Sequence, residues 1–194
     1  MKNIAVLVSG GGTNLQALIN AQIDGIISSG KITLVVSNNP DAYALTRAQN
    51  SGIKTVVCNK KELLDKFEDE LIAVLEENNI DFIVLAGFMC ILSEKFTTRF
   101  ANRIINVHPS LIPSFCGKGF YGLKVHEAAL EYGVKVTGAT VHFVNEIPDG
   151  GKIIMQKAVN ILENDTPETL QKRVMEEAEW IILPLALEKV CSEL

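Results

Sequence analysis

The chain has 194 residues, of which 47% are hydrophobic and 21% are charged. This composition excludes an intrinsically disordered chain, and the length predicts a single domain over residues 1–194. Lysine and arginine total 18 against 23 acidic residues, so the net charge is −5, which argues against the broad basic surface that sequence-independent nucleic-acid binding needs.

The first hundred residues alternate short apolar runs with amphipathic segments. This rhythm predicts an α/β fold, a doubly wound, mostly parallel Rossmann-like sheet with helices on both faces. Asp41 is expected to cap the second helix. The expected strands cover residues 4–8, 32–36, 53–58, 82–86 and 103–107, and the expected helices cover residues 14–27, 41–51, 62–77 and 93–100.

The pattern changes in the second half. Residues 110–122 are rich in Gly, Pro and Ser and predict a loop, and a helix is expected over 123–132. Two late strands, 136–145 and 152–162, are expected to extend the sheet as a hairpin. A long C-terminal helix is expected to start at a cap on Asp165, followed by Glu168 three residues later. It should reach about Cys191 and kink or break near Pro184.

The sequence contains no sign of a membrane segment or a metal site. No apolar run approaches the roughly 18–20 residues of a membrane span, and the first apolar run is too short for a signal peptide. The four cysteines have no Cys-x-x-Cys spacing, which predicts free thiols in a reducing compartment. We therefore expect a cytoplasmic protein with no membrane partner and no bound metal.

Residues 9–14, Ser-Gly-Gly-Gly-Thr-Asn, follow the first expected strand and precede the first helix. Glycines let the backbone bring its N–H groups close to a ligand, and the helix N-terminus adds positive charge, so the segment predicts an anion site. It lacks the ending of a Walker loop, and no acidic residue follows the second strand to hold a ribose. A phosphate monoester is therefore favoured over NAD, and a tight turn without a ligand is the alternative.

Asn106 and His108 are two residues apart at the end of a strand that Pro109 terminates. Their side chains should face the same side, at the edge of the sheet where α/β proteins bind ligands. Histidine transfers protons near neutral pH, and an asparagine amide can donate to an oxyanion. The alternative is a core histidine with a polar neighbour.

Asp149 lies in the turn segment Pro148-Asp-Gly-Gly151. A carboxylate near His108 would favour the imidazolium and raise its pKa. Plain hairpin chemistry is the alternative, since Asp-Gly is a common turn pair.

Four segments together resemble phosphoribosylglycinamide formyltransferases over residues 4 to about 185. They are residues 9–17 (Ser-Gly-Gly-Gly-Thr-Asn-Leu-Gln-Ala), 85–89 (Leu-Ala-Gly-Phe-Met), 106–113 (Asn-Val-His-Pro-Ser-Leu-Ile-Pro) and 140–151 (Thr-Val-His-Phe-Val to Pro-Asp-Gly-Gly). The resemblance implies formyl transfer from 10-formyltetrahydrofolate, a co-substrate, to the amine of glycinamide ribonucleotide, without a metal. It assigns Asn106 to oxyanion stabilisation, His108 to proton transfer, and Asp149 to tuning His108 and ordering water.

The resemblance also implies binding residues and a division of the domain. Residues 1–100 would form the phosphate-binding half and residues 101–194 the catalytic and folate-binding half. The ribonucleotide phosphate would lie on Gly12, Thr13 and Asn14, and Glu179 would contact its ribose. The implied folate contacts are Met89, Cys90, Ile91, Leu92, Asn106, Asn145, Glu146, Ile147, Pro148 and Asp149.

Three departures from the family pattern stand out. Cys90 replaces a usual arginine, which predicts either weaker binding of a folate with a single glutamate or a substitute cation. A family arginine falls on Leu64 by spacing, and no nearby lysine is assigned in its place. Residues 114–122 differ from the common loop, so no contacts of this loop are transferred.

Other functions stay open from the sequence. A 10-formyltetrahydrofolate hydrolase would use water in place of the amine, and a non-catalytic phosphate-binding protein would keep the glycine loop alone. A methionyl-tRNA formyltransferase is disfavoured because such chains are longer. The expected partners are small-molecule substrates, and the chain is expected to be a monomer or a homodimer.

Overall fold

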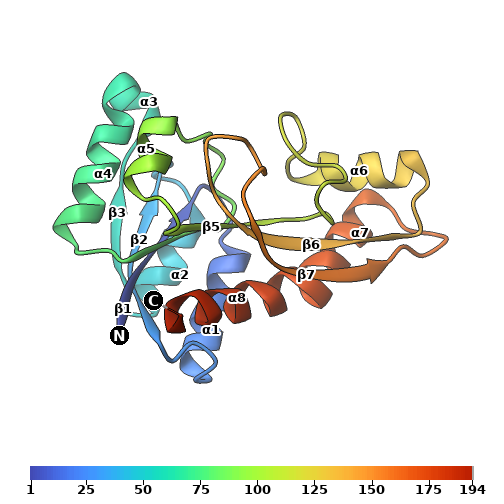
Figure 1. Ribbon diagram of the computed structural model, residues 1–194, viewed down its shortest axis with the longest axis horizontal. Coiled ribbons are helices and arrows are strands. Elements are labelled where there is room, and N and C mark those ends of the chain that lie inside the picture. The colour runs from blue at the N-terminus through green and yellow to red at the C-terminus, as the bar shows by residue number, and fades with distance from the viewer. Residues whose placement is uncertain (194) are drawn as a thin grey trace.

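The computed structural model describes residues 1–193. One seven-stranded sheet runs through the molecule in the order β3-β2-β1-β4-β5-β6-β7 (Figure 1). The first five strands are parallel, while β6 is antiparallel to β5 and to β7, so the late strands extend the sheet as predicted. The strands are β1 Lys2–Val8, β2 Gly30–Ser37, β3 Lys54–Val57, β4 Phe82–Leu85, β5 Ile104–His108, β6 Val136–Phe143 and β7 Ile153–Asn160.

Helices cover both faces of the sheet, which confirms the predicted α/β architecture (Figure 1). One apolar core packs α1, α2, α7 and α8 against the sheet, and the other packs α4 and α5. The helices are α1 Thr13–Ile23, α2 Tyr43–Asn50, α3 Lys60–Leu63, α4 Phe67–Glu77, α5 Glu94–Arg99, α6 Leu123–Tyr132, α7 Pro167–Val174 and α8 Trp180–Ser192. None of these helices has the length and apolar character of a membrane span.

Strand β1 lies inside the sheet, and residues 4–8 of this strand are all apolar. Ile4, Val6 and Val8 point into the core under α1 and α8, while Ala5 and Leu7 point into the core under α4. All five residues are fully buried, as expected for a strand covered on both faces. The strand ends at Val8, at the carboxyl edge of the sheet, and residues 9–14 follow directly.

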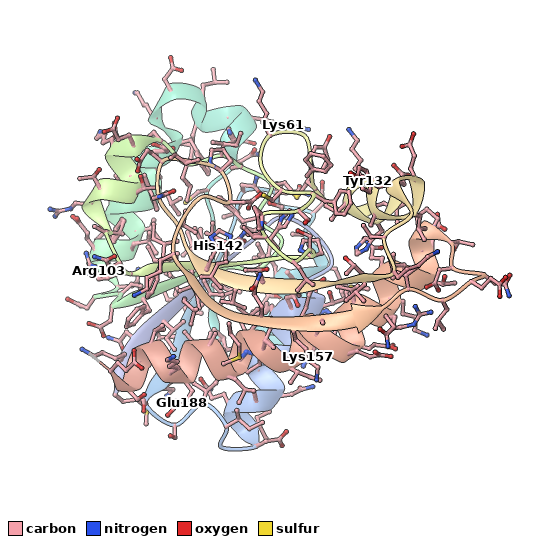
Figure 2. The ribbon with its side chains drawn as sticks, turned by 45° about the vertical axis from the view of Figure 1, so that its right-hand side comes forward. Lys61, Arg103, Tyr132, His142, Lys157 and Glu188 are labelled. Carbon is pink, nitrogen blue, oxygen red and sulfur yellow. The ribbon has the colours of Figure 1, made fainter. Side chains whose placement is uncertain are left out.

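The C-terminal helix is fastened to the start of β2 by one carboxylate. Glu188 lies on α8, at the lower side of the molecule in Figure 2. Its oxygens accept the backbone N–H groups of Ser28 and Ser29 at 2.8 and 2.9 Å, together with both serine hydroxyls. These contacts hold the pKa of Glu188 at about 2, although partial burial acts to raise it.

Two predicted helix starts are wrong. Ala42, and not Asp41, occupies the N-cap of α2, and no side chain caps it. Thr166 caps α7 through a reciprocal pair of hydrogen bonds with Thr169. Asp165 instead binds Arg173 through two hydrogen bonds, and a carboxylate engaged in a bidentate ion pair is not free to cap the helix.

Two predicted helices differ from the observed ones. The first is divided where the sequence predicts one continuous helix, and the second is irregular at a different place from the predicted one. The segment 62–77 divides at Leu64, whose φ of 47° ends α3 before a short 3-10 turn (Leu64–Lys66) and α4. At the C-terminus, α8 continues through Pro184. The irregular turn lies earlier, in a π-helical segment over Met175–Glu179 that joins α7 to α8.

Candidate active site

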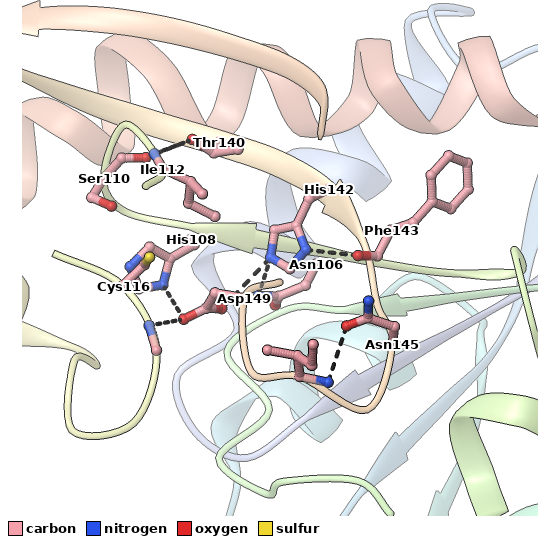
Figure 3. Close-up of polar contacts among 12 residues, drawn as sticks. Asn106, His108, Ser110, Ile112, Cys116, Thr140, His142, Phe143, Asn145 and Asp149 are labelled. Carbon is pink, nitrogen blue, oxygen red and sulfur yellow. Dashed lines mark hydrogen bonds and ion pairs between the residues drawn. The ribbon is translucent and has the colours of Figure 1, made fainter. Parts of the chain in front are cut away.

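Asn106 and His108 project from the end of β5 and lie beside β6 (Figure 3). In the antiparallel pairing, Asn106 is opposite His142 and His108 is opposite Thr140. His108 is the last residue of the strand and is 4% exposed. The predicted pair therefore reaches the carboxyl edge of the sheet, with a second histidine, His142, next to it.

Asp149 comes from the connection between β6 and β7 and faces both histidines (Figure 3). Its Oδ2 lies 3.5 Å from Nδ1 of His108, and its Oδ1 lies 3.6 Å from Nε2 of His142. The backbone N–H of Gly117 donates to Oδ2 at 2.8 Å. The expected approach of Asp149 to His108 is thus present, although the two residues are 41 positions apart in the sequence.

The connection that carries Asp149 has a strained backbone and passes very close to β6. Asp149 has a φ of 57°, a region that side chains other than glycine seldom adopt. A Cβ atom on Gly151 would lie 1.7 Å from the carbonyl oxygen of Phe143. Glycine is therefore required at position 151 for the connection to bring the carboxylate over His108.

His142 orients the amide of Asn106. Nδ1 of His142 lies 2.8 Å from the carbonyl oxygen of Phe143, and because a carbonyl can only accept, this nitrogen carries the hydrogen. In neutral His142 the other nitrogen, Nε2, is then an acceptor, 3.3 Å from Nδ2 of Asn106. One N–H of the Asn106 amide is used in this contact, and its second N–H can donate to a ligand.

His108 is engaged at both ring nitrogens. Nε2 lies 2.8 Å from the carbonyl oxygen of Phe115 and donates to it, while Nδ1 faces Asp149. Burial lowers the pKa of His108, and the carboxylate of Asp149 acts in the opposite direction. The predicted upward influence of Asp149 is present, but burial outweighs it. A proton taken up at Nδ1 would be stabilised at once by the facing carboxylate.

The carboxyl of Asp149 stays ionised in this environment. Burial acts to raise its pKa, but the contact with His142, the charge of His108 and the Gly117 N–H outweigh burial and lower it. The site therefore holds one fixed negative charge beside His108, which is suited to stabilising a transient positive charge on that ring.

The loop after β5 is held over the site by hydrogen bonds to one threonine. The hydroxyl of Thr140 donates to the Ser110 carbonyl at 2.7 Å and accepts from the Ile112 N–H at 3.1 Å (Figure 3). Gln156 on β7 donates to the same hydroxyl and to the Ile112 carbonyl. These contacts fix the start of the 110–122 loop, whose Phe115 carbonyl and Gly117 N–H reach His108 and Asp149.

The glycine loop at residues 9–14 presents backbone donors. The carbonyls of Ser9, Gly10, Gly11 and Gly12 all accept hydrogen bonds from other groups. Within residues 1–193, the N–H groups of these three glycines have no hydrogen-bond acceptor. Gly12 adopts the left-handed conformation with φ 73° at the N-cap of α1, which Thr13 begins. Such a loop at a helix N-terminus is suited to binding a phosphate.

Glu179 lies next to this loop at the end of the π-helical segment. It is 6% exposed, and its Oε2 accepts a hydrogen bond of 2.7 Å from Nδ2 of Asn14. Burial raises its pKa to about 6, and the Asn14 bond acts in the opposite direction. The structure thus brings Glu179 to the glycine loop, 165 residues away in sequence, while the ribose contact that the resemblance implies stays a prediction.

Two connections at this edge of the sheet carry exposed apolar side chains, and we call them the two walls. The first is the segment after β4, where Met89 and Ile91 are exposed, Cys90 is half-buried and Leu92 is buried. Nδ2 of Asn38 donates to the Cys90 sulfur at 2.9 Å. Exposed apolar side chains on such a wall suit a flat heterocyclic ligand.

The second wall is the connection between β6 and β7. Asn145 folds this connection by accepting the Ile147 N–H at 3.0 Å. Glu146, Ile147 and Pro148 are exposed. Val144 at its start and Cys90 on the first wall both pack against the core under α4 and α5.

The glycine loop and the cluster of Asn106, His108 and Asp149 lie at the same edge of the sheet. The hydroxyl of Ser9 accepts the Met89 N–H at 2.8 Å, which joins the ends of β1 and β4. Since β4 lies between β1 and β5, strand spacing places the ends of β1 and β5 about 10 Å apart. The geometry suits a small ligand with an anionic group at one end and its reactive group at the other.

Sequence reasoning missed three groups that complete the site. His142 depends on the register of β5 and β6, although its place two residues after Thr140 on one strand face offered a signal. The Phe115 carbonyl and the Gly117 N–H are backbone groups of a loop, and nothing in their side chains identifies them. Within residues 1–193, no group of three or more His, Cys, Asp or Glu side chains is arranged to hold a metal ion.

Comparisons with known proteins agree with this geometry. The formyl transferase family model matches residues 2–187. The chain is 44% identical to phosphoribosylglycinamide formyltransferase of Haemophilus influenzae, covering 96% of this chain and 86% of the relative. It is 46% identical to the human trifunctional purine biosynthetic protein adenosine-3, covering 97% of this chain but 18% of that protein.

A solved structure gives the same result for the fold. Glycinamide ribonucleotide transformylase 1 from Symbiobacterium toebii is 40% identical and superposes with a TM-score of 0.92, covering 100% of this chain and 89% of the other. Together with the catalytic cluster and the glycine loop, these likenesses show that the chain belongs to the formyl transferase family.

Proposed function

We propose that this protein is a phosphoribosylglycinamide formyltransferase. It transfers the formyl group of 10-formyltetrahydrofolate to the amine of glycinamide ribonucleotide in purine biosynthesis. The names of its relatives from Haemophilus influenzae and human support this substrate and pathway. The observation that carries the proposal is the Asn106, His108 and Asp149 cluster at the same sheet edge as the phosphate loop.

The reaction divides into addition and elimination. The amine nitrogen of glycinamide ribonucleotide attacks the formyl carbon, and the carbonyl electron pair moves to oxygen to form a tetrahedral oxyanion. The attacking nitrogen loses a proton, the bond from carbon to N10 of the folate breaks, and N10 takes up a proton. The products are formylglycinamide ribonucleotide and tetrahydrofolate, so atoms and charge balance.

Asn106 and His108 stabilise the charge that develops in this sequence. The amide N–H of Asn106 that His142 does not use donates to the oxyanion. His108 accepts the proton from the attacking nitrogen, and Asp149 stabilises the resulting imidazolium and orders water for the proton transfer. Direct hydrogen bonding from Nε2 of His108 to the substrate requires displacement of the Phe115 carbonyl.

The substrates occupy the remaining surfaces. The phosphate binds the backbone N–H groups of Gly12, Thr13 and Asn14, where α1 begins, and Glu179 contacts the ribose. The pterin of the folate lies between the two apolar walls, against residues 89–92 and 145–149. Residues 1–100 then form the phosphate-binding half, and residues 101–194 the catalytic and folate-binding half.

The proposal extends to partners and compartment. The partners are the two small-molecule substrates, no nucleic acid takes part, and the chain acts as a monomer or a homodimer. Cys58, Cys90, Cys116 and Cys191 are free thiols, which fits a reducing compartment such as the cytoplasm.

Folate absorbance tests the proposed reaction. The purified protein is mixed with 10-formyltetrahydrofolate with and without glycinamide ribonucleotide, and tetrahydrofolate release is recorded. Release that depends on the ribonucleotide is expected. Equal release in both mixtures would indicate a hydrolase, and no release in either, with binding of both ligands, would indicate a non-catalytic binding protein. Either result would overturn the proposal.

A further inference from the structure

The phosphate loop has no positive side chain of its own. Residues 9–14 contain no lysine, arginine or histidine, so the local contribution to anion binding comes from the backbone N–H groups and the start of α1. A doubly charged phosphate monoester binds more strongly where a cation lies close by. A cation near this loop must therefore come from another element.

Helix α2 binds the carbonyl groups of the 9–14 loop. The backbone N–H of Ala44 donates to the Gly10 carbonyl at 3.0 Å, and Nε of Arg47 donates to the Gly11 carbonyl at 2.8 Å. The helix also approaches Gly12 so closely that a Cβ there would lie 2.6 Å from the Cβ of Ala44. Two successive loop carbonyls are thus bound to α2, which leaves the loop N–H groups free for a ligand.

Arg47 is fixed in place and carries an unneutralised charge. Its Nη1 donates to Oε1 of Gln16 on α1 at 3.2 Å, and its guanidinium lies 5.0 Å from the ring centroid of Tyr43. Arg99 and Arg173 form ion pairs with carboxylates, whereas Arg47 has no carboxylate within 4 Å among residues 1–193. Its positive charge is therefore available to a bound anion.

We propose that Arg47 is a positioning residue for phosphate recognition by this loop. Its Nε–H holds the Gly11 carbonyl so that the adjacent N–H groups face the ligand, and its guanidinium supplies the positive charge that the loop lacks. The identity of the phosphate as that of glycinamide ribonucleotide rests on the proposed function. The role of Arg47 toward a phosphate monoester does not.

Phosphate binding and turnover are measured separately to test this role. Binding of ribose 5-phosphate is measured by calorimetry for the unsubstituted protein and for Arg47→Met, Arg47→Lys and Arg103→Met. Arg103 is the matched control because it also donates to a backbone carbonyl and stacks over an aromatic ring, that of Phe100. It precedes β5, at the sheet edge opposite the phosphate loop.

A charge-assisted hydrogen bond contributes enough that Arg47→Met should weaken ribose 5-phosphate binding about tenfold or more. Arg47→Lys should weaken it less, because the charge remains while the fixed Nε–H is lost. Arg103→Met should bind as the unsubstituted protein does. Equal affinity of Arg47→Met and the unsubstituted protein would overturn the proposal, as would an unsubstituted protein that binds no ribose 5-phosphate.

Steady-state kinetics separate positioning from a general structural effect. Arg47→Met should raise the KM for glycinamide ribonucleotide about tenfold, leave kcat and the folate KM near their original values, and leave kcat/KM for the unphosphorylated glycinamide riboside unchanged. An equal fall in kcat/KM for glycinamide ribonucleotide and for the unphosphorylated riboside would overturn the assignment. Absent turnover by the unsubstituted protein, with the binding result intact, would overturn the proposed function and leave the role of Arg47 standing.

Discussion

The proposed phosphate loop and the proposed catalytic cluster lie at one sheet edge but are built differently. The loop is six consecutive residues that offer backbone N–H groups to a ligand. The cluster takes single side chains from β5, β6 and the β6–β7 connection. A site made of backbone groups needs only a short segment of residues with free backbone conformation. A site made of side chains needs the correct strand register and loop path across residues 106–149. Substitutions should therefore affect binding in the first region and the chemical step in the second.

Replacing Asn106 tests the catalytic side of this comparison with the largest expected effect. Asn106→Ala removes a donor to the oxyanion, so kcat should fall about a hundredfold or more, while the KM for glycinamide ribonucleotide changes little. Steady-state kinetics measure both. Asn50→Ala, at the exposed end of α2, is the control and should match the unsubstituted protein. A raised KM with unchanged kcat would place Asn106 in binding instead.

Replacing Gly12 tests the loop side. Gly12→Ala places a side chain at φ 73° and within 2.6 Å of Ala44, so the loop must move and the KM for glycinamide ribonucleotide should rise roughly tenfold, with a stability loss of roughly 1–2 kcal/mol. Gly25→Ala is a matched control, because Gly25 has φ 77° with open space around its Cβ position. Gly25→Ala should lose stability without any change in the KM for glycinamide ribonucleotide. Equal KM values for both variants would contradict the prediction.

Glu179 connects the loop to the C-terminal helix, and its pH behaviour tests that connection. Its folded pKa of about 6 is above the usual 4.5, so its contribution to stability is present below pH 4.5 and is lost as pH rises through about 6. The stability of Glu179→Gln relative to the unsubstituted protein should therefore increase by about 2 kcal/mol between about pH 4.5 and 7. Urea unfolding of both proteins at the two pH values measures this. A constant difference would show that Glu179 titrates normally.

Cys90 gives the smallest expected effect. Cys90→Arg restores a cation on the wall after β4, where the sulfur now accepts from Asn38. An exposed ion pair contributes about 0–1 kcal/mol, so the KM for a folate with one glutamate should fall roughly threefold. Cys90→Ser, which adds no charge, is the control and should leave that KM unchanged. An unchanged folate KM in Cys90→Arg would show that the carboxylate of the folate does not lie near residue 90.

The parts of the fold that follow from local sequence were predictable. The apolar run at residues 4–8 predicts a strand buried on both faces, and the Ser-Gly-Gly-Gly-Thr-Asn segment predicts a glycine turn that leads into α1, because each depends on neighbouring residues alone. Phosphate binding by this turn stays a prediction. Asn106 and His108 were found for the same reason, since alternation along one strand places both on one face.

The errors arose where distant contacts decide the local structure. Asp165 looked like a helix cap but is bound by Arg173, eight residues later, and Thr166 takes the cap. Pro184 was expected to kink or break the last helix, but the helix continues through it and the π-helical turn lies before the helix begins. The contact of His142 with Asn106 depends on the antiparallel register, and the Phe115 carbonyl on the path of a loop. A periodic pattern cannot specify either.

The most direct test of the division between binding and chemistry is single-turnover formyl transfer by His108→Ala, with the dissociation constant of glycinamide ribonucleotide measured on the same protein. The account predicts an unchanged dissociation constant and a rate at saturating ribonucleotide that falls about a hundredfold or more. A near-normal rate at saturation, with weaker ribonucleotide binding, would contradict it and would place His108 among the binding residues.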